Sequence, residues 1–471
     1  MENKIHKFGE KVLYLYLFFL FVVMPLYSKG GYHMISTTKW ALFCNVSYGY
    51  QFGYFFIPGF LIILSFCFIF EVLFYKAYVE KFDKADIMLL LFGVVVALSE
   101  KISFYHLTYF VTEESQAFVG YRGWYMGLIA QISFILIYFF VKRYWGGSKR
   151  IVDIAIIGST IVFFLAVLNR FDIDLLGFTG SLLEVDKHDY VSTIGNINWY
   201  VCYLAVLFPL SVYSYIGASN RIKKILYGIA IMIGTATLVT QGSDSAFLVL
   251  GVLVLYLLKN EDNNVLIELL LIVSGTCILI GFLQNLFSSY AYVPNRLSEL
   301  VTKSFVLYVL FGLGLLFRNK IDLFDKFKKL VFKMIPILLL LVIVYILLNT
   351  FNILPEQLRT YGYFRISDSW GNNRGNIWRV GVYAFIAFVI DHPYVLFLGA
   401  GPDQYANMIF TYNYEEVVVQ RSTVFVSCAH NEFLNTLCNY GILGFVSFYM
   451  FWYFVIFDKK RENTLFNRMC I

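Results

Sequence analysis

The chain of 471 residues is 59% hydrophobic and 20% aromatic but only 14% charged, which excludes a water-soluble protein because a soluble surface of that size needs far more charge. The net charge of +6 does not indicate nucleic-acid binding, since the basic residues lie in short separate segments rather than in one stripe. The seven cysteines include no Cys-x-x-Cys pair. We therefore expect no metal site, no cofactor and no nucleic-acid partner, and we expect the lipid bilayer to be the main solvent.

Long apolar stretches run through almost the whole chain. A helix that crosses the hydrocarbon core of a bilayer, about 30 Å thick, needs roughly 20 apolar residues. We therefore predict an all-α polytopic membrane protein with about twelve transmembrane helices, a single integral membrane domain over 1–471. In chain order the predicted spans are 12–27, 52–74, 86–104, 119–141, 151–168, 196–216, 225–240, 245–258, 265–286, 300–317, 331–350 and 437–457.

Two of these stretches, 245–258 and 300–317, have short apolar cores, so as spans they need cover from neighbouring helices. The first stretch follows three lysines and resembles a signal peptide. No small-x-small cleavage pattern follows Pro25, so we interpret this stretch as a retained anchor.

The positions of Lys and Arg predict the orientation, because basic loops are retained in the cytoplasm during insertion. With the N-terminus inside, the predicted cytoplasmic segments hold 24 of the 37 basic residues. If either of the two short stretches, 245–258 or 300–317, did not cross the membrane, a basic loop would be placed outside the cytoplasm. The N- and C-termini are therefore expected to be cytoplasmic.

The longest segment between predicted spans, 351–436, is then expected to be an extracytoplasmic loop before the last helix. Within it, 374–390 has an apolar run of only eleven residues from Val380, which is too short to cross the membrane. We predict an amphipathic helix that lies on or dips into the outer leaflet, with Arg374, Trp378 and Val382 on one face. Irregular backbone at a membrane surface is tolerated where it shapes a wet cavity, so function is expected to concentrate here.

The rest of this loop contains two turns and then the start of the last span. The chain is predicted to break at 391–393 and to turn sharply at 399–402, because both stretches contain Pro and the second contains two glycines. Asn431 is a plausible N-cap of the last helix, which would place His430 at the outward-facing mouth of that helix.

Three stretches resemble the O-antigen ligase and O-antigen polymerase family of bacterial membrane glycosyltransferases, and the similarity extends over 115–457 in the same order. They are His430-Asn431 with Leu434 and Gly441-Ile442-Leu443-Gly444, then Arg374 with Ile377-Trp378, Pro393, Gly399, Gly401, Pro402 and Tyr405, and finally Gly195-Asn196-Ile197-Asn198 with Tyr203, Leu204 and Pro209. Weaker similarity is found at Gly120-Tyr121-Arg122 and Gly127-Leu128. The family's outer hairpin usually reads Ser-Arg-small-Ala, but here Asp244 replaces the arginine.

The resemblance implies transfer or polymerisation of an undecaprenyl-pyrophosphate-linked glycan onto a glycan or lipid acceptor, at the outer face of the cytoplasmic membrane. Such chemistry needs a base for the acceptor hydroxyl and cations for the pyrophosphate. His430 is the candidate base, and Arg374 and Arg122 are the candidate cations. Arg379 is expected to share the phosphate contact, or Asp244 to orient an acceptor sugar. Asn431 completes the candidate substrate-binding residues.

Each assignment has a simpler structural interpretation. Arg374 is also compatible with an interface anchor, Arg122 with an ordinary boundary cation, and Trp378 with an aromatic belt. Polymerase and ligase cannot be distinguished from the sequence. A lipid-linked oligosaccharide flippase or another polysaccharide transporter is the alternative class, although the two halves of the chain are dissimilar. A cell-wall polymerase of the shape-and-division type would need an acidic catalytic loop residue that we do not find.

Overall fold

The computed structural model describes residues 2–75, 82–107, 116–183, 186–360, 362–413 and 426–457. These residues are predominantly α-helical, and within them the strands form two small antiparallel hairpins: β1 (Gly49–Phe52) pairs with β2 (Phe55–Pro58), and β3 (Tyr190–Val191) pairs with β4 (Gly195–Asn196). The predicted all-α fold class is confirmed. Some sequence predictions fall outside the described residues, namely those on Lys76, Lys81, residue 115, Arg421 and the basic segment 459–468.

Most of the helices cover the predicted apolar stretches, whereas α3 (Ile35–Tyr48) was not predicted. The helices are α1 (Glu2–Phe18), continued by a π-helical turn (Phe19–Val23) into α2 (Met24–Leu26), α3 (Ile35–Tyr48), α4 (Phe60–Tyr75), α5 (Lys84–His106), α6 (Leu128–Tyr144), α7 (Lys149–Asn169), α8 (Ile197–Ile216), α9 (Arg221–Thr240), α10 (Ser245–Asn260), α11 (Asn263–Leu286), α12 (Arg296–Lys303), α13 (Phe305–Asn319), α14 (Ile321–Thr350), α15 (Trp370–Asp391), α16 (Val395–Leu398), α17 (Tyr405–Tyr412) and α19 (Glu432–Phe457).

Eight of the described helices are long and apolar enough to cross a bilayer, and nine if the bent pair α12 and α13 counts as one span. The apolar helices α4 and α10 are shorter. The protein is thus a multi-pass membrane protein, while the predicted count of twelve is not confirmed.

Several predicted boundaries differ from the structure. The helices of the stretches 12–27, 331–350 and 437–457 begin earlier than predicted, at Glu2, Ile321 and Glu432. Three further differences have a local cause. The stretch 52–74 begins with β1 and β2, and its helix starts only after Pro58 and Gly59. The stretch 119–141 becomes helical at Leu128, because the residues before it form turns in which Gly120 and Gly123 have φ of +94° and +99°. In 300–317 the chain bends by 48° between α12 and α13.

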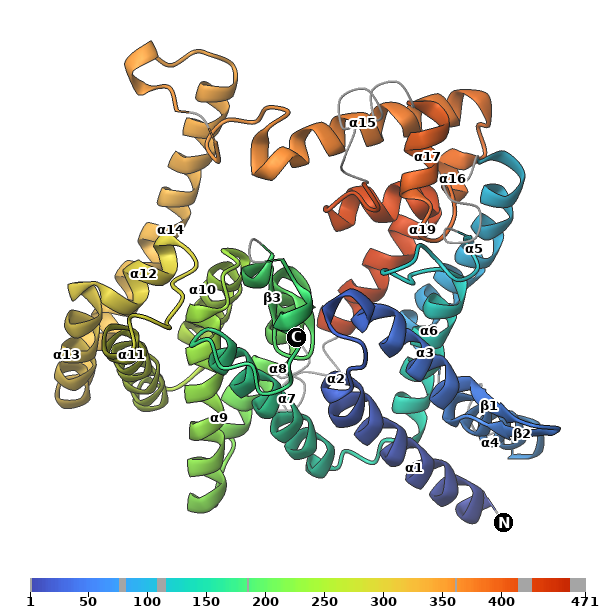
Figure 1. Cartoon of the computed structure of the whole chain (residues 1–471), viewed down its shortest axis with the longest axis horizontal. Helices are drawn as coiled ribbons and strands as arrows, with labels where there is room; N and C mark the ends of the chain where they lie inside the picture. The colour runs from blue at the N-terminus through green and yellow to red at the C-terminus, as the bar shows by residue number, and fades with distance from the viewer. Residues whose placement is uncertain are drawn as a thin grey trace. The chain divides into compact units, whose positions relative to one another are not determined.

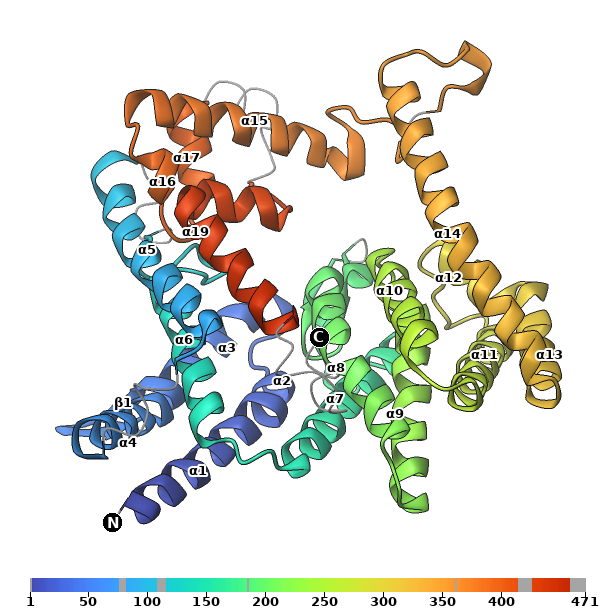
Figure 2. The ribbon, with the colours of Figure 1, turned by 180° about the vertical axis from the view of Figure 1, so that it is seen from behind.

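The chain divides into two compact units. Unit 1 comprises Met1–Gly9, Leu61–Tyr144 and Met334–Arg461, and unit 2 comprises Glu10–Phe60, Trp145–Lys333 and Glu462–Ile471. In unit 1, α19 packs along α5, while α15, α16 and α17 gather around the start of α19, as the orange and red helices of Figures 1 and 2 show.

Two polar clusters support one end of unit 1. Lys142 of α6 contacts the carboxylates of Asp83 and Asp86 at 2.7 and 2.6 Å, and these two aspartates also form the capping box that starts α5. Arg143 contacts the buried Glu71 of α4 at 2.6 Å. These ion pairs tie α4, α5 and α6 together.

In unit 2, α7, α8, α9 and α11 pack around a large apolar core, and α13 packs on α11. Phe163, Tyr200, Phe208 and Ile231 are among its fully or almost fully buried side chains. Tyr200 and Thr237 share a hydrogen bond of 2.6 Å between their hydroxyl groups, which links α8 to α9 inside this core.

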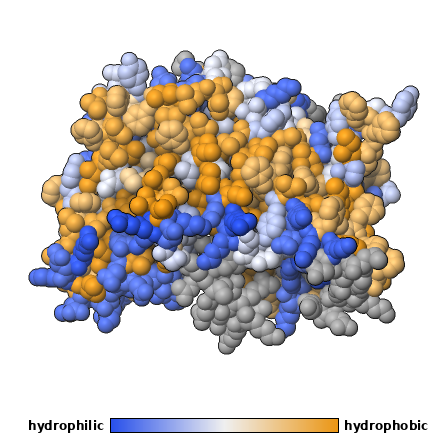
Figure 3. All heavy atoms as spheres, turned by 90° about the horizontal axis from the view of Figure 1, so that it is seen from below, coloured by the Kyte–Doolittle hydropathy of each residue, from blue (hydrophilic) through white to orange (hydrophobic). Residues whose placement is uncertain are grey.

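Large apolar side chains also lie on the outside of the helices. In α14, Leu338, Leu340 and Ile343 are 52%, 62% and 54% exposed. Figure 3 shows apolar residues over much of the face that it displays. Exposed aliphatic side chains of this density match lipid and not water.

Candidate functional site

The candidate site of unit 1 is built on a close crossing of two backbone segments. Ala400 and Gly401 donate backbone hydrogen bonds of 2.8 Å to the carbonyls of Cys438 and Asn439 in α19. Gly399 has φ of +73°, and a Cβ there would lie 2.3 Å from the nitrogen of Tyr440. Gly441 has φ of +61° and interrupts α19 at the same place. Only glycine fits these two positions, so the turn after α16 is locked to the last helix.

Asp403 follows directly after this turn and is 8% exposed. Its Oδ2 accepts backbone hydrogen bonds from Tyr121 at 2.7 Å and from Met126 at 3.3 Å. Burial raises the pKa of the Asp403 carboxyl to about 7, and the two backbone N–H bonds oppose that shift. A Cβ at Gly120 would lie 2.7 Å from the same oxygen, so a glycine permits the approach.

The turn that Asp403 holds, residues 116–127, carries two residues of interest. Arg122 is exposed on it. Trp124 has its ring centroid 6.5 Å from that of His430, in an edge-to-face arrangement. The turn closes on itself through a backbone hydrogen bond of 2.9 Å from Leu128 to Ala117. Asp403 therefore connects the Arg122 turn to the neighbourhood of His430, which lies more than three hundred residues away in sequence.

His430 stands at the start of α19, with φ of +48°. The Asn431 side chain accepts a hydrogen bond of 3.2 Å from the backbone of Leu434, which confirms the predicted N-cap. The residue before His430, Ala429, is buried, and its carbonyl accepts a 2.9 Å hydrogen bond from the indole nitrogen of Trp378. The imidazole itself is exposed, at the mouth of the helix as predicted.

Arg374 influences this histidine electrostatically. Partial burial lowers the pKa of His430, and the nearby cation of Arg374 lowers it further. Arg374 lies on an exposed part of α15, and among the described residues it forms no salt bridge. The α15 helix is connected to α17, because the Tyr405 hydroxyl donates a hydrogen bond of 2.8 Å to the Ile377 carbonyl.

Arg379, one turn further along α15, has a different environment. Its guanidinium forms a two-pronged contact with Asp368, with distances of 3.0 and 2.9 Å. The Arg379 side chain lowers the pKa of the Asp368 carboxyl. The guanidinium of Arg379 is therefore paired with a carboxylate, whereas the guanidinium of Arg374 has no carboxylate partner among the described residues.

Asp244 belongs to unit 2 and is described by itself. It precedes α10, and its Oδ1 accepts a hydrogen bond of 2.8 Å from Asn295, the N-cap of α12. A cation does lie beside this hairpin: the buried Arg170 at the end of α7 donates to the carbonyls of Gln241 and His188. Burial lowers the pKa of Arg170 to about 10. Sequence reasoning missed Arg170, because it lies 71 residues before Gln241.

The structure thus brings together His430 and Asn431, with Arg374 close enough to affect the histidine and with the Arg122 turn in contact through Trp124. Sequence reasoning missed Asp403 and the structural role of Trp378. The signal for Asp403 was its place directly after the predicted Gly-Pro turn. No group of three or more potential metal-ligating side chains occurs among the described residues.

These features define the class: an α-helical multi-pass membrane protein with a candidate site, bearing a histidine and arginines, at the start of α19. Residues 295–449 match the family model described as O-antigen ligase. The match includes Arg374, Arg379, Asp403, His430 and Asn431, and it confirms that the chain is similar to the O-antigen ligase and polymerase family of membrane glycosyltransferases. Neither the curated proteins nor the solved structures contain a match to the chain.

Proposed function

We propose that the protein transfers or polymerises an undecaprenyl-pyrophosphate-linked glycan at the outer face of the cytoplasmic membrane of a bacterium. The observation that carries this proposal is the position of the exposed His430 near Trp124 of the Arg122 turn. The residue before His430 is hydrogen-bonded to Trp378 of α15, the helix that also carries Arg374. His430, Trp378 and Arg374 all lie within the segment that matches the O-antigen ligase family. A glycan or a lipid would be the acceptor. The site is formed by the proposed extracytoplasmic loop 351–436 and its membrane-surface helix α15, in a chain that acts as one integral membrane domain over 1–471.

In the proposed reaction, an acceptor hydroxyl oxygen attacks the anomeric carbon while the bond from that carbon to the pyrophosphate oxygen breaks. His430 takes the hydroxyl proton, and the leaving pyrophosphate keeps the electron pair of the broken bond. A neutral imidazole is needed for this role, and the lowered pKa of His430 favours it. A positioned general base is typically worth about 10²–10⁴-fold in rate.

The arginines stabilise the pyrophosphate as its charge grows. Arg374 is the principal clamp in this proposal, because its guanidinium has no carboxylate partner among the described residues and its planar fork fits two phosphate oxygens. Arg122 is the second cation, held by its turn on Asp403. Arg379 contributes to phosphate binding only if it exchanges Asp368 for the ligand. Asn431, which caps the helix that begins after His430, is the remaining candidate substrate-binding residue.

The experiment that tests this function is deletion of the gene followed by analysis of carrier-linked glycans. Accumulated single repeat units would identify a polymerase, and accumulated long carrier-linked chains would identify a ligase. A strain with normal carrier-linked glycans that no longer moves a solute or a lipid-linked oligosaccharide across the membrane would instead establish the transporter class, and the glycosyltransferase proposal would be wrong.

A further inference from the structure

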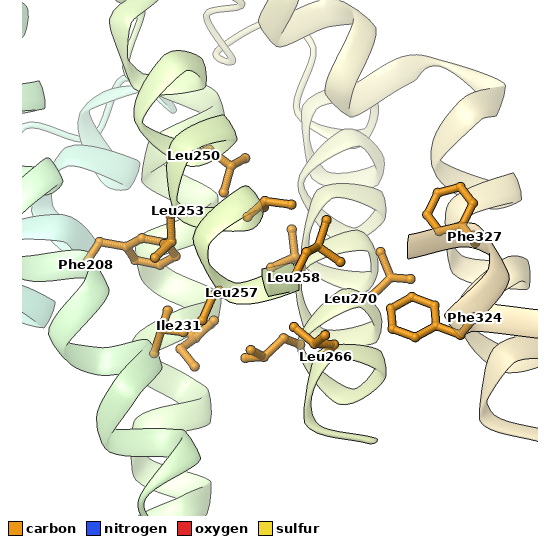
Figure 4. A pocket seen from close by; sticks show the side chains of 14 residues that line it. Phe208, Ile231, Leu250, Leu253, Leu257, Leu258, Leu266, Leu270, Phe324 and Phe327 are labelled. Carbon is orange, nitrogen blue, oxygen red and sulfur yellow. The ribbon is translucent and has the colours of Figure 1, made fainter. Parts of the chain in front are cut away.

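An apolar cavity lies within unit 2, and none of the proposed transfer residues lines it. It has a volume of about 190 Å³ and lies between α8, α9, α10, α11 and the first turns of α14. Fourteen side chains line it, and all of them are Leu, Ile, Val or Phe (Figure 4). The lining therefore offers a ligand only dispersion contacts and the hydrophobic effect.

Helix ends form two sides of the cavity. Leu257 and Leu266 are each 6% exposed and lie just before and just after the loop that joins α10 to α11. Phe324 and Phe327 close the opposite side, from the start of α14 (Figure 4). Val254, which also lines the cavity, is 43% exposed, so the cavity communicates with the outer surface of α10.

An apolar cavity of this size does not retain water, since water there has no polar partners. Left empty, such a volume destabilises the surrounding helices. In a bilayer the hydrocarbon available to fill it is a lipid chain, which enters from the lipid-facing side at Val254. A segment of a few methylene groups from such a chain is apolar, as are all the side chains that line the cavity.

Basic residues beside the cavity favour lipids with an anionic head group. The first turns of α14 are amphipathic, because Phe324 and Phe327 face the cavity while the neighbouring Lys326 lines a polar recess. The other charged residues of the recess are Arg318, Lys320 and Asp322, so three cations outnumber one carboxylate there. Within the described part of the chain, Lys320 and Lys326 form no salt bridge. A basic recess one residue away from an apolar cavity matches a ligand with an acyl chain and an anionic head group.

We propose that unit 2 binds one anionic phospholipid, with an acyl chain in the apolar cavity and the phosphate group at Arg318 and Lys326. The bound lipid fills the space between α10, α11 and α14 and holds the start of α14 against the core through Phe324, which also packs on Phe317 with ring centroids 5.1 Å apart. This site does not depend on the proposed transfer reaction.

The test uses the full-length protein purified in a mild detergent, delipidated, and mixed with phosphatidylglycerol or phosphatidylcholine that carry identical palmitoyl and oleoyl chains. Native mass spectrometry should show one phosphatidylglycerol retained per protein, with weaker retention of phosphatidylcholine. Because ligand binding stabilises the folded state, phosphatidylglycerol should also raise the apparent melting temperature more than phosphatidylcholine does.

Two variants separate the chain site from the head-group site. Leu253→Trp places a large ring in the cavity and should abolish retention of both lipids, while Leu248→Trp on the lipid-facing side of the same helix is its matched control. Arg318→Gln combined with Lys326→Gln leaves the core intact and should weaken phosphatidylglycerol binding about fivefold per charge removed. Lys149→Gln, on α7, is the control for loss of charge.

Equal retention of the two lipids would overturn the head-group assignment. Retention of phosphatidylglycerol that survives both Leu253→Trp and the double charge variant would show that the lipid binds elsewhere, and the proposal would be wrong. Loss of glycan transfer is not part of the readout, so failure of this proposal and failure of the proposed function are distinguishable.

Discussion

Trp378 donates a hydrogen bond from its indole nitrogen to the backbone carbonyl of Ala429, at 2.9 Å. The bond connects α15, which carries Arg374, to the residue directly before His430. Sequence reasoning assigned Trp378 to an aromatic belt, in which the indole would face the bilayer surface. The structure instead gives it a defined partner that positions the candidate base relative to the candidate phosphate clamp.

Trp378→Phe keeps most of the ring but removes this donor. The buried Ala429 carbonyl then lacks its partner, at a cost of about 1 kcal/mol, and we expect roughly a fivefold lower transfer rate at an unchanged level of inserted protein. Trp452→Phe is the matched control, because Trp452 is 43% exposed on α19. Equal transfer rates in the wild type and in Trp378→Phe would show that the hydrogen bond to Ala429 is not needed, and would favour the aromatic-belt interpretation of Trp378.

His430→Ala should lose most turnover while the protein inserts normally and still binds donor, since only the proton acceptor is removed. Asn431→Ala should have a smaller effect, because a helix N-cap is worth about 1 kcal/mol. Glycan transfer from the lipid carrier by purified protein is the measurement. Near wild-type transfer by His430→Ala would mean that electrostatics and positioning alone support the reaction.

The pH dependence separates the charge of Arg374 from its shape. An imidazolium cannot accept a proton, so the rate should fall as the pH drops through the pKa of His430, which lies below the ordinary 6.5. Arg374→Gln removes one cause of that lowering, so the acid limb should move to higher pH.

Arg374→Lys keeps the charge and therefore the position of the acid limb, but it loses the two-pronged fork and should transfer glycan poorly. Arg296→Lys, at an exposed position in unit 2, is the control. A fully active Arg374→Lys variant with an unchanged pH profile would support an interface anchor instead of a phosphate clamp.

Asp403→Ala removes the acceptor that the backbone N–H groups of Tyr121 and Met126 share. Each buried donor left unpaired costs about 1–3 kcal/mol, so the turn carrying Arg122 should loosen and transfer should fall. Asp403→Asn keeps one acceptor oxygen at the same place and should retain more activity. Protease accessibility of 116–127 should increase in Asp403→Ala, and equal protection in both variants would exclude this positioning role.

The orientation is tested with reporter fusions. Reporters placed after Lys149 and after Lys328 should lie in the cytoplasm, and one near Asn413 should lie outside, because 24 of the 37 basic residues are in the predicted cytoplasmic segments. An inward-facing Asn413 would contradict both the predicted topology and the outer location of the site.

Much of this protein follows from local sequence properties. Apolar runs bounded by charge determined where helices form, since a bilayer forces each apolar segment to pair its own backbone groups. The Asn431 cap and the irregular turn at 399–402 could also be predicted from the sequence, because helix caps and glycine-dependent turns are determined by a few neighbouring residues. The family likeness came from the same short-range motifs.

Only the tertiary structure decided which distant residues meet. Asp403 accepts hydrogen bonds from the backbone N–H groups of Tyr121 and Met126. Almost every residue has such an N–H group, so no pattern of side chains in the sequence predicts this contact. Arg379 and Arg374 read alike in sequence, yet the fold places Asp368 against one of them alone. The apolar cavity beside Phe324 likewise depends on how five helices pack, because long-range contacts and unfilled space are properties of the assembled fold and not of any one segment.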